Sequence, residues 1–496
     1  MNSGLLERLI ATLGRERITY CHWKSTFYLH LDHAEDGRDL DVLVDRRDAQ
    51  RFEAVLASLG FKRAVDPIYG QAIAVHHCFG WDESLGTFIH VHVFYRIITG
   101  ESLLKNYSLP FEKLLLSDCR KIEGIPTPQP AAELMQLVIR VMLKYASLPE
   151  YVLLRRRARQ GYEDLAEELA YLRKDGADEQ CSELLAHWLP SVDADLFQEC
   201  LNGLRNETSA VRTAWLAYRL RRRMKAYGRF SFVAAFYHRT LMLLKLISWR
   251  VLRKGKRKHL SSGGIVIAFV GPEATGKSTL VAQSERWLNR VFAVRTVHAG
   301  KPPSSWLTAP LNLLLPLIRR WGPRRRGAQT EDAGQSNKSS VASLIYAVRC
   351  VALAWDRLRL LSKARRAGAN GELVICDRYP SNVVGAMDSP RLRPSANGGG
   401  LIAAVHNRLA RLETHLYKQV PPPDIVLRLT VPVETAKRRN HERIKPDKES
   451  DAYLEARHRQ GRHWHRNGST RIHEIDTNRP LDETLRQVRQ VIWESV

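Results

Sequence analysis

The sequence predicts a mixed α/β protein that ends in a parallel sheet with helices on both faces. Two observations predict it. A short apolar run, 264–270, leads into a glycine loop, and a helix-forming stretch, 279–289, follows that loop. Further apolar runs of strand length alternate with helical stretches through the same half of the chain, a pattern typical of parallel sheets covered on both faces. The chain has 496 residues, which is enough for several domains with cores of their own.

The glycine loop, Gly271-Pro-Glu-Ala-Thr-Gly-Lys-Ser278, matches the phosphate-binding motif G-x-x-x-x-G-K-[ST]. Its glycines let successive N–H groups converge on phosphate oxygens, and the following helix adds its positive N-terminal dipole. We expect Lys277 to reach the β- and γ-phosphates and the Ser278 hydroxyl to ligate Mg²⁺. The expected nucleotide contacts are Gly271, Glu273, Ala274, Thr275, Gly276, Lys277, Ser278 and Thr279.

Composition excludes several classes of protein. With 44% apolar and 26% charged residues, the chain is not disordered as a whole. Seven cysteines are scattered without a C-x-x-C pair, which argues against a disulfide framework or structural zinc and fits a reducing, cytoplasmic compartment. The N-terminus lacks the apolar core of a signal peptide, and no uncharged apolar run reaches the ~20 residues of a membrane span.

The formal charge of +25 indicates affinity for anions, such as nucleotides, nucleic acid, acidic saccharides or an anionic membrane face. Basic residues cluster at 219–225, 254–258 and 319–326. They do not alternate with aromatic residues as in a platform for single strands, so nucleic acid is not indicated. Charge that serves only solubility and linkers is an equally good explanation. The sequence is compatible with a homodimer but does not fix the oligomeric state.

We expect three parts: 1–125, 126–260 and 261–496. The middle part is predicted to be helical, since apolar residues recur at helical spacing between short breaks. Its last stretch, Phe230–Leu252, is aromatic and aliphatic but carries His238, Arg239, Lys245 and Arg250. These charges argue against a membrane span. An ordinary packing helix is the favoured interpretation, and a basic helix lying on the inner membrane face is the alternative. The helices expected before it are 133–145, 162–174, 180–189 and 210–225.

In the first part, Asp39 and Asp41 enter an apolar run that reads as a strand, so their side chains share one face. This part resembles the nucleotidyltransferase fold of the DNA polymerase β superfamily, in which a Gly-Ser element precedes a D-x-D strand and a neighbouring strand adds a third carboxylate. Here Lys24-Ser25 replaces the Gly-Ser element, and His90 or His92 stands where the third carboxylate belongs. We therefore expect this α+β fold with a binding role or a decayed active site, rather than nucleotidyl transfer.

Two further elements of the last part carry chemistry. The apolar run 372–376 ends in Asp377-Arg-Tyr379, at the strand end where open α/β sheets bind ligands. A strand at 424–429 precedes a helix whose Arg439 and Arg443 lie four residues apart and share a face. Together with the glycine loop and Asp356-Arg357, these stretches resemble the thymidylate kinase family of P-loop nucleoside monophosphate kinases, over roughly the last 235 residues.

The resemblance implies ATP as phosphoryl donor and Mg²⁺ held by Ser278 and Asp377. It assigns the acceptor phosphate to Arg378, with Arg357 on the acceptor side, and gives Arg439 and Arg443 to a mobile lid. The implied catalytic set is Lys277, Asp377, Arg378, Arg439 and Arg443.

The same resemblance leaves the acceptor open. The family has an R-E-P element after its second strand, whereas this chain has Lys301 followed by two prolines. Lys301 supplies charge for acceptor binding without the planar fork of arginine. Transfer to a nucleoside monophosphate such as dTMP is the expected activity. The alternatives are a kinase of a sugar or glycan precursor, and a nucleotide-gated regulatory protein.

Overall fold

The computed structural model describes most of the chain and divides it into two compact units, Met1–Lys256 and Arg257–Val496. The described residues are 4–24, 26–30, 39–70, 74–101, 103–145, 165–173, 177–205, 210–252, 255, 257–304, 308, 341–382, 388–394, 401–442, 450–461 and 470–496.

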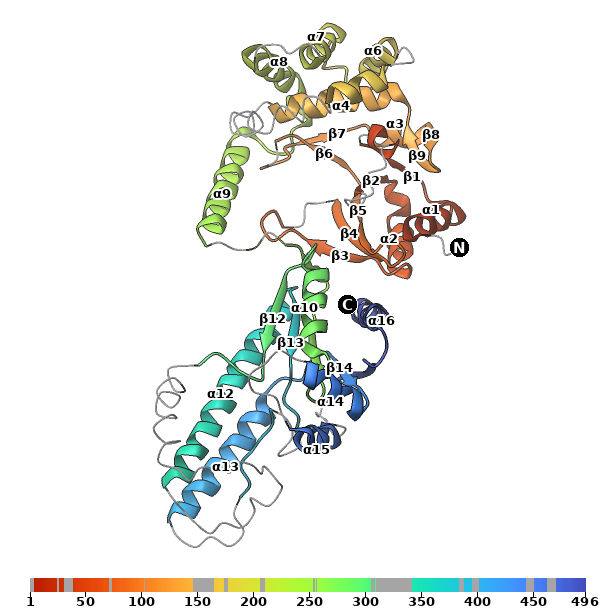
Figure 1. Ribbon diagram of the computed structural model, residues 1–496. Coiled ribbons are helices and arrows are strands. Elements are labelled where there is room, and N and C mark those ends of the chain that lie inside the picture. Colours follow the sequence, from red (N-terminus) through yellow and green to blue (C-terminus); the bar gives the residue numbers. More distant parts are fainter. Residues whose placement is uncertain are drawn as a thin grey trace. The chain divides into compact units, whose positions relative to one another are not determined.

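The first unit is an α+β structure followed by a helical layer (Figure 1). Its strands are β1 (Tyr20–His22), β2 (Asp39–Val44), β3 (Lys62–Val65), β4 (Val75–Asp82), β5 (Thr87–Phe94), β6 (Ile97–Thr99), β7 (Tyr107–Leu109), β8 (Cys119–Ile122) and β9 (Ile125–Pro128). Its helices are α1 (Leu5–Arg15), α2 (Ala49–Ser58), α3 (Glu112–Ser117), α4 (Pro130–Tyr145), α6 (Ala177–Trp188), α7 (Ala194–Arg205), α8 (Ala210–Arg223) and α9 (Phe232–Val251), with short 3-10 turns at Thr26–His30, Arg46–Asp48 and Met224–Tyr227.

The main sheet of this unit runs in the order β1-β2-β5-β4-β3, with β2 and β5 parallel and the other pairs antiparallel. Strand alternation divides β2 between two cores. Leu40 and Val42 pack with α1 and α2, whereas Leu43 joins a second core with Trp23, Phe94 and the helical layer. Asp39 and Asp41 are therefore on the side of the sheet that carries Leu43.

Residues 1–125 and the helices after them share that second core, in which Phe94 and Phe111 pack with α4 residues such as Met135 and Val138. Both stretches thus lie in one compact unit. The separate domains 1–125 and 126–260 stay a prediction. Helices lie near the expected positions, with 162–164 and Lys174 outside the described residues, and helix α7 was not expected.

Helix α9 departs from the favoured expectation of a packing helix. Among its residues only Ala235 is fully buried, and most of its large apolar side chains are exposed. No helix of the described residues is long and apolar enough to cross a membrane.

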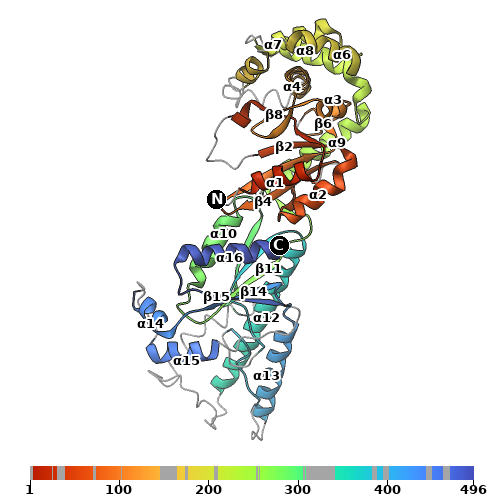
Figure 2. The same cartoon turned by 90° about the vertical axis from the view of Figure 1, so that its right-hand side faces the viewer.

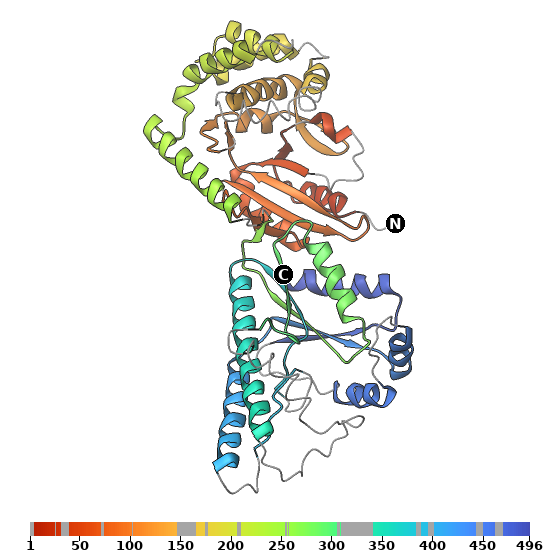
Figure 3. The same ribbon diagram turned by 60° about the vertical axis from the view of Figure 1, so that its left-hand side comes forward.

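The second unit is an open α/β sheet (Figures 1 and 3). Its strands are β10 (His259–Leu260), β11 (Val266–Val270), β12 (Val294–His298), β13 (Leu373–Asp377), β14 (Ile425–Thr430) and β15 (Arg471–Asp476). Its helices are α10 (Lys277–Leu288), α12 (Val341–Ala369), α13 (Leu401–Gln419), α14 (Val433–Glu442), α15 (Asp451–Gly461) and α16 (Leu481–Ser495).

The sheet runs β12-β13-β11-β14-β15, and every pair is parallel, as expected. Strand β11 lies at its centre and is buried along its whole length. Its residues Val266, Ala268 and Val270 face a core shared with α12 and α13. The alternate residues, Ile267 and Phe269, are fully buried on the other face, where α10 and α16 contact each other (Figure 2). The central strand therefore delivers the glycine loop to the carboxyl edge of the sheet.

Candidate active site

The glycine loop connects β11 to α10, in the strand–loop–helix order that the motif requires. Gly276 precedes the helix with a φ of 83°, and Ala274 also has a positive φ, of 61°. Gly271 has a φ of 151°, and a Cβ at that position would lie 2.7 Å from the carbonyl oxygen of Leu429. A side chain is excluded at Gly271 by the close approach of β14, so this glycine is required by packing as well as by conformation.

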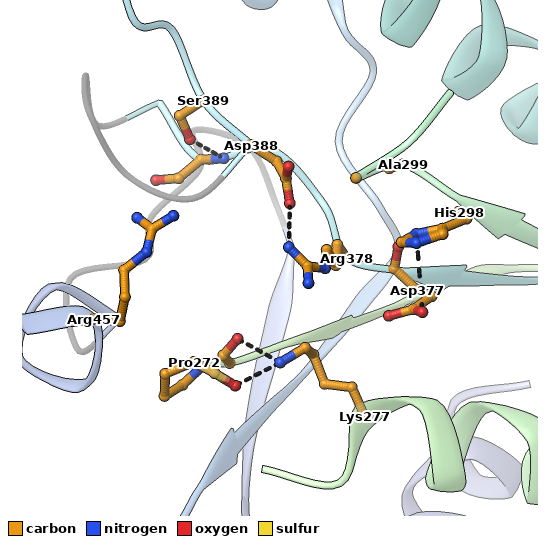
Figure 4. Close-up of polar contacts among 12 residues, drawn as sticks. Pro272, Lys277, His298, Ala299, Asp377, Arg378, Asp388, Ser389 and Arg457 are labelled. Carbon is orange, nitrogen blue, oxygen red and sulfur yellow. Dashed lines mark hydrogen bonds and ion pairs between the residues drawn. The ribbon is translucent and has the colours of Figure 1, made fainter. Parts of the chain in front are cut away.

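The side chain of Lys277 folds back over the loop (Figure 4). Its Nζ donates to the carbonyl oxygens of Gly271 and Pro272, at 2.9 and 2.5 Å, and lies 3.4 Å from Oγ1 of Thr275. The residue is only 7% exposed. The ammonium group is therefore held at the centre of the loop, where phosphate oxygens would replace the carbonyls as its partners.

Asp377 and Arg378 lie beside the loop, because β13 is the direct neighbour of β11 and Asp377 is in register with Phe269. The backbone N–H of Arg378 donates to the carbonyl of Phe269, at 3.0 Å. Arg378 has a φ of 72°, in the left-handed region that non-glycine residues adopt at a cost. This backbone turn ends the strand and places both side chains at the sheet edge (Figure 4).

Oδ1 of Asp377 is buried and has no hydrogen-bond partner in the described part of the chain. A buried carboxylate oxygen without a partner is costly and is rare in native structures. Mg²⁺ is commonly bound by one or two protein oxygens, with water and phosphate completing the shell. Asp377 and Ser278 both line one cavity, so the residues present fit the expected metal.

Arg378 is supported from behind by a buried ion-pair network. Nη1 of Arg378 lies 3.6 Å from Oδ2 of Asp388, and Oδ1 of Asp388 accepts a hydrogen bond of 2.9 Å from Nη2 of Arg357. Arg357 also donates to the carbonyl of Ala299, at 3.0 Å, and to the hydroxyl of Tyr417, at 2.5 Å. Arg357 is 4% exposed and its donors are directed at protein acceptors, so it supports the wall of the site from the inside.

A cavity of about 470 Å³ opens between the loop and these strand ends. Cationic side chains dominate its wall: Lys277, Lys301, Arg378, Arg391 and Arg457. Carboxylates from Glu273, Asp377 and Asp388 also line it. Of the residues expected to bind the acceptor, Arg378 and Lys301 line this cavity, whereas Arg357 does not.

Arg439 lies elsewhere. It lines a second cavity of about 250 Å³, together with Thr279 and Leu280 of α10. Its Nη2 donates to the carbonyl oxygen of Thr477, at 2.7 Å. The structure thus does not bring Arg439 to the larger cavity, and Arg443 lies outside the described residues. The lid roles of both arginines stay predictions.

Helix α15 contributes two cavity residues that no sequence motif singled out, Tyr453 and Arg457. They are four residues apart, and Nε of Arg457 donates to the Tyr453 hydroxyl, at 3.0 Å. The next residue, His458, is hydrogen-bonded through Nε2 to the carbonyl of Glu273, at 3.1 Å, which docks α15 on the glycine loop. The four-residue spacing that puts Tyr453 and Arg457 on one helical face was the available signal. Because the surrounding sequence is basic and polar, it looked the same as a solvent-exposed helix surface.

The carboxylates of the first unit have partners of a different kind. Asp41 accepts hydrogen bonds from Lys24 Nζ, at 2.8 Å, and from Nδ1 of His92, at 3.0 Å, and Asp39 accepts one from Nδ1 of His90, at 2.8 Å. The parallel register of β2 and β5 places each Asp opposite its histidine. Although burial opposes it, these partners hold the pKa of Asp41 well below its usual range.

Burial lowers the pKa of Lys24 to about 8 and that of His92 to about 4. Within the described residues, no group of three or more His, Cys, Asp or Glu side chains is arranged to hold a metal ion. Asp41 is thus held in a buried cluster with Lys24 and His92, while Asp39, whose side chain is 71% exposed, pairs with His90.

A central strand, its phosphate-binding loop and the helix after it define the second unit as a P-loop nucleotide-binding fold. No protein-family model matches the chain. An Escherichia coli K12 protein described as "uncharacterized ATP-binding protein YghR" is 30% identical over 233 residues, which cover 46% of this chain and 86% of that protein. The protein of the same description from E. coli O6:H1 (strain CFT073 / ATCC 700928 / UPEC) matches equally well. The chain belongs to the family of these ATP-binding proteins.

Several solved structures are similar at lower identity. Thymidylate kinase from Candida albicans is 17% identical, with a TM-score of 0.27, over 46% of this chain and 91% of that one. Deoxyadenosine kinase from M. mycoides, with bound dATP, is 15% identical, with a TM-score of 0.28, over 46% and 99%. Thymidylate kinase from Ehrlichia chaffeensis is 18% identical, with a TM-score of 0.22, over 46% and 98%. With TM-scores below 0.5, these matches say nothing about the substrate of this chain.

Proposed function

We propose that the second unit is an ATP-dependent phosphotransferase, which moves the γ-phosphoryl group of ATP onto a nucleoside monophosphate such as dTMP. The proposal rests mainly on the division of charge in the larger cavity. Lys277 is committed to the loop that would hold the donor phosphates, yet Arg378, Arg391 and Arg457 add further cations to the same wall. So many cations exceed what the donor phosphates need, and an acceptor that already carries a phosphate would bind to the arginines among them.

The donor would lie along the glycine loop. The two cavities share Ala274, Thr275 and Gly276, so a triphosphate in the larger one can continue into a nucleoside in the smaller one. There Arg439, which lines the smaller cavity and donates a hydrogen bond to Thr477, would contact the base. The description of the E. coli relatives as ATP-binding supports ATP as the donor.

Phosphoryl transfer requires alignment and charge neutralisation more than covalent catalysis. An oxygen of the acceptor phosphate would attack the γ-phosphorus as the bond to the β–γ bridging oxygen breaks, releasing ADP. The attacking phosphate is already anionic, so no general base is needed. Lys277 would neutralise charge on the donor side, and Arg378 would hold the acceptor phosphate in line.

Ser278 and Asp377 would hold Mg²⁺, which would supply positive charge to the donor phosphates. The partnerless Oδ1 of Asp377 supports this assignment. Arg357 would act as a positioning residue, since it contacts Asp388 and lies outside the cavity lining, and Asp388 would orient Arg378 from the cavity wall.

The test is an ATP-consumption screen against nucleoside monophosphates, nucleosides, and free and phosphorylated sugars. Monophosphates are expected to be the best acceptors, and Arg378→Ala is expected to raise the acceptor KM or lower kcat about ten- to a hundred-fold with little change in ATP affinity. Arg408→Ala, at an exposed position on α13, is the matched control. If unphosphorylated sugars react well and Arg378→Ala leaves their kinetics unchanged, the monophosphate assignment fails and a sugar kinase replaces it.

For the first unit we propose a nucleotidyltransferase-like fold without nucleotidyl transfer. Two observations support this. Strand β5 places His90 and His92, and not a carboxylate, beside Asp39 and Asp41. Asp41 already forms an ion pair with Lys24 and accepts a hydrogen bond from His92.

A further inference from the structure

Helix α9 presents a broad apolar stripe to solvent. At about 100° per residue, nine of its large apolar side chains fall on one half of the helix. Phe232 is 83% exposed, Phe236 62% and Ile247 58%. We call these residues the α9 stripe: Phe232, Val233, Phe236, Tyr237, Leu241, Leu243, Leu244, Ile247 and Val251. Exposed apolar patches of this kind mark interaction surfaces in folded proteins.

Residues on the other half of α9 fix the helix to its own unit. Ala235 is buried there, and Arg239 donates through Nε to Oε1 of the buried Glu101, at 2.9 Å. Ser231 caps the helix by accepting from the N–H of Ala234. Figures 1 and 3 draw α9 at the edge of the first unit (light green). The orientation of the stripe is therefore set by contacts within the unit, and the stripe itself faces away from them.

The charged side chains of α9 itself are all basic. Lys245 and Arg250 are exposed and fall near its two edges in the helical projection. From Thr208 to Pro272 the sequence contains fifteen Lys and Arg residues and no Asp or Glu. A protein partner with an acidic face would pair with the cations but would leave a stripe of this width exposed. A purely apolar partner would bury the stripe but would leave the cations unpaired. An anionic bilayer surface satisfies both, because apolar side chains enter the acyl boundary while flanking cations meet lipid phosphates.

We propose that α9 docks the protein on an anionic membrane surface, with the α9 stripe inserted at the headgroup level and Lys245 and Arg250 against lipid phosphates. The helix lies in the plane of the interface and does not span the bilayer. The proposed kinase reaction is independent of this docking, since no residue of α9 lines either cavity of the second unit.

The test is co-sedimentation of the full chain with vesicles of phosphatidylcholine, alone or with about one third phosphatidylglycerol. The account predicts roughly ten-fold stronger binding to the anionic vesicles, weakened by high salt. Phe236→Glu with Ile247→Glu should reduce this binding about ten-fold or more, because two inserted apolar side chains become charged. Leu85→Glu, at a 70% exposed position outside α9, is the matched control and should bind as the unchanged protein does.

A second pair of variants tests the charge argument. Lys245→Glu with Arg250→Glu should weaken binding to anionic vesicles about ten-fold, whereas Lys113→Glu with Lys121→Glu, at exposed positions elsewhere in the first unit, should not. Equal binding to both vesicle types would overturn the proposal, as would a stripe variant that binds like the unchanged protein. If the protein ignores vesicles and light scattering shows a dimer that the stripe variant dissociates, the stripe covers a second copy and the membrane proposal is wrong.

Discussion

The carboxylate of Asp388 accepts a hydrogen bond from the guanidinium of Arg357, with 2.9 Å between Oδ1 and Nη2, and both residues are almost fully buried. The other oxygen of Asp388 lies 3.6 Å from Arg378. Asp388 has a φ of 60°, a strained conformation that persists because the surrounding contacts fix it. One carboxylate thus links a buried arginine to an arginine of the cavity wall.

Changing Asp388 to Asn tests this link. The amide keeps the size of the side chain but removes the negative charge that orients Arg378, so the acceptor KM should rise about ten-fold. ATP affinity should stay unchanged, because the hydrogen bond and the ion pair of Asp388 described here join it to Arg357 and Arg378 and not to the glycine loop. Steady-state kinetics for both substrates give the answer, with Asp482→Asn at an exposed position on α16 as the control. An unaltered acceptor KM would show that Asp388 does not position Arg378.

Replacing Arg357 by Met should chiefly affect stability. The change removes the Arg357 partner of the buried Asp388 carboxylate. Removing one member of a buried ion pair lowers the free energy of unfolding by about 3–5 kcal/mol. Urea unfolding of the second unit is the measurement. A variant of unchanged stability with a strongly raised acceptor KM would instead support the acceptor-side role that the family resemblance implied for Arg357.

Asp39 and Asp41 should be dispensable for phosphoryl transfer, since they lie in a different unit from the glycine loop. The double change to Asn is expected to keep kcat within about two-fold while destabilising the first unit, because Lys24 loses the partner that offsets its burial. Kinetics and thermal unfolding of the full chain check both points. Mn²⁺-dependent nucleotidyl transfer that this double change abolishes would show that the first unit is an enzyme in its own right.

His92 should make the first unit sensitive to acid. Burial lowers its pKa to about 4, below the ordinary value of 6.5, so between these pH values the unfolded chain binds a proton that the folded chain does not. Stability therefore falls as pH drops from about 6.5 to 4. His92→Gln should flatten this dependence by about 1.4 kcal/mol for each pKa unit of the shift. Thermal unfolding at pH 6.5 and 4.5, compared between the two proteins, gives the difference. Equal pH dependence would refute a neutral buried His92.

The sequence predicted the elements whose signals are local. The apolar run of β11 supports a phosphate-binding loop after it, and the loop motif in turn supports a strand before it. Asp377, at the end of β13, was predicted from the rule that ligands bind at the carboxyl ends of strands. By contrast, Asp388 and Arg391 belong to a segment with no periodic pattern, and only the folded chain brings them to the cavity. Their roles depend on contacts between residues far apart in sequence, which periodicity does not report.

For helix α9 the sequence predicted the secondary structure but not the exposure. Its composition predicted the helix correctly. An apolar sequence with a few charges, however, is the same for a buried helix and for an exposed one, so it did not predict the exposure. Charge spacing alone likewise could not separate Arg357, whose guanidinium is buried, from Arg378, which reaches the cavity wall. Burial is a property of the packed structure, and it decides which arginine supports the site and which one meets the ligand.

The central claim is that Lys277 neutralises charge on the ATP phosphates while the γ-phosphoryl group is transferred. The most direct measurement follows ATP labelled at the γ-phosphate, incubated with the full chain, Mg²⁺ and a nucleoside monophosphate. The account predicts that label appears on the monophosphate to give the diphosphate, and that Lys277→Ala, with its fold intact by circular dichroism, lowers this rate by at least roughly a hundred-fold. Label transfer at an unchanged rate in folded Lys277→Ala would contradict the account.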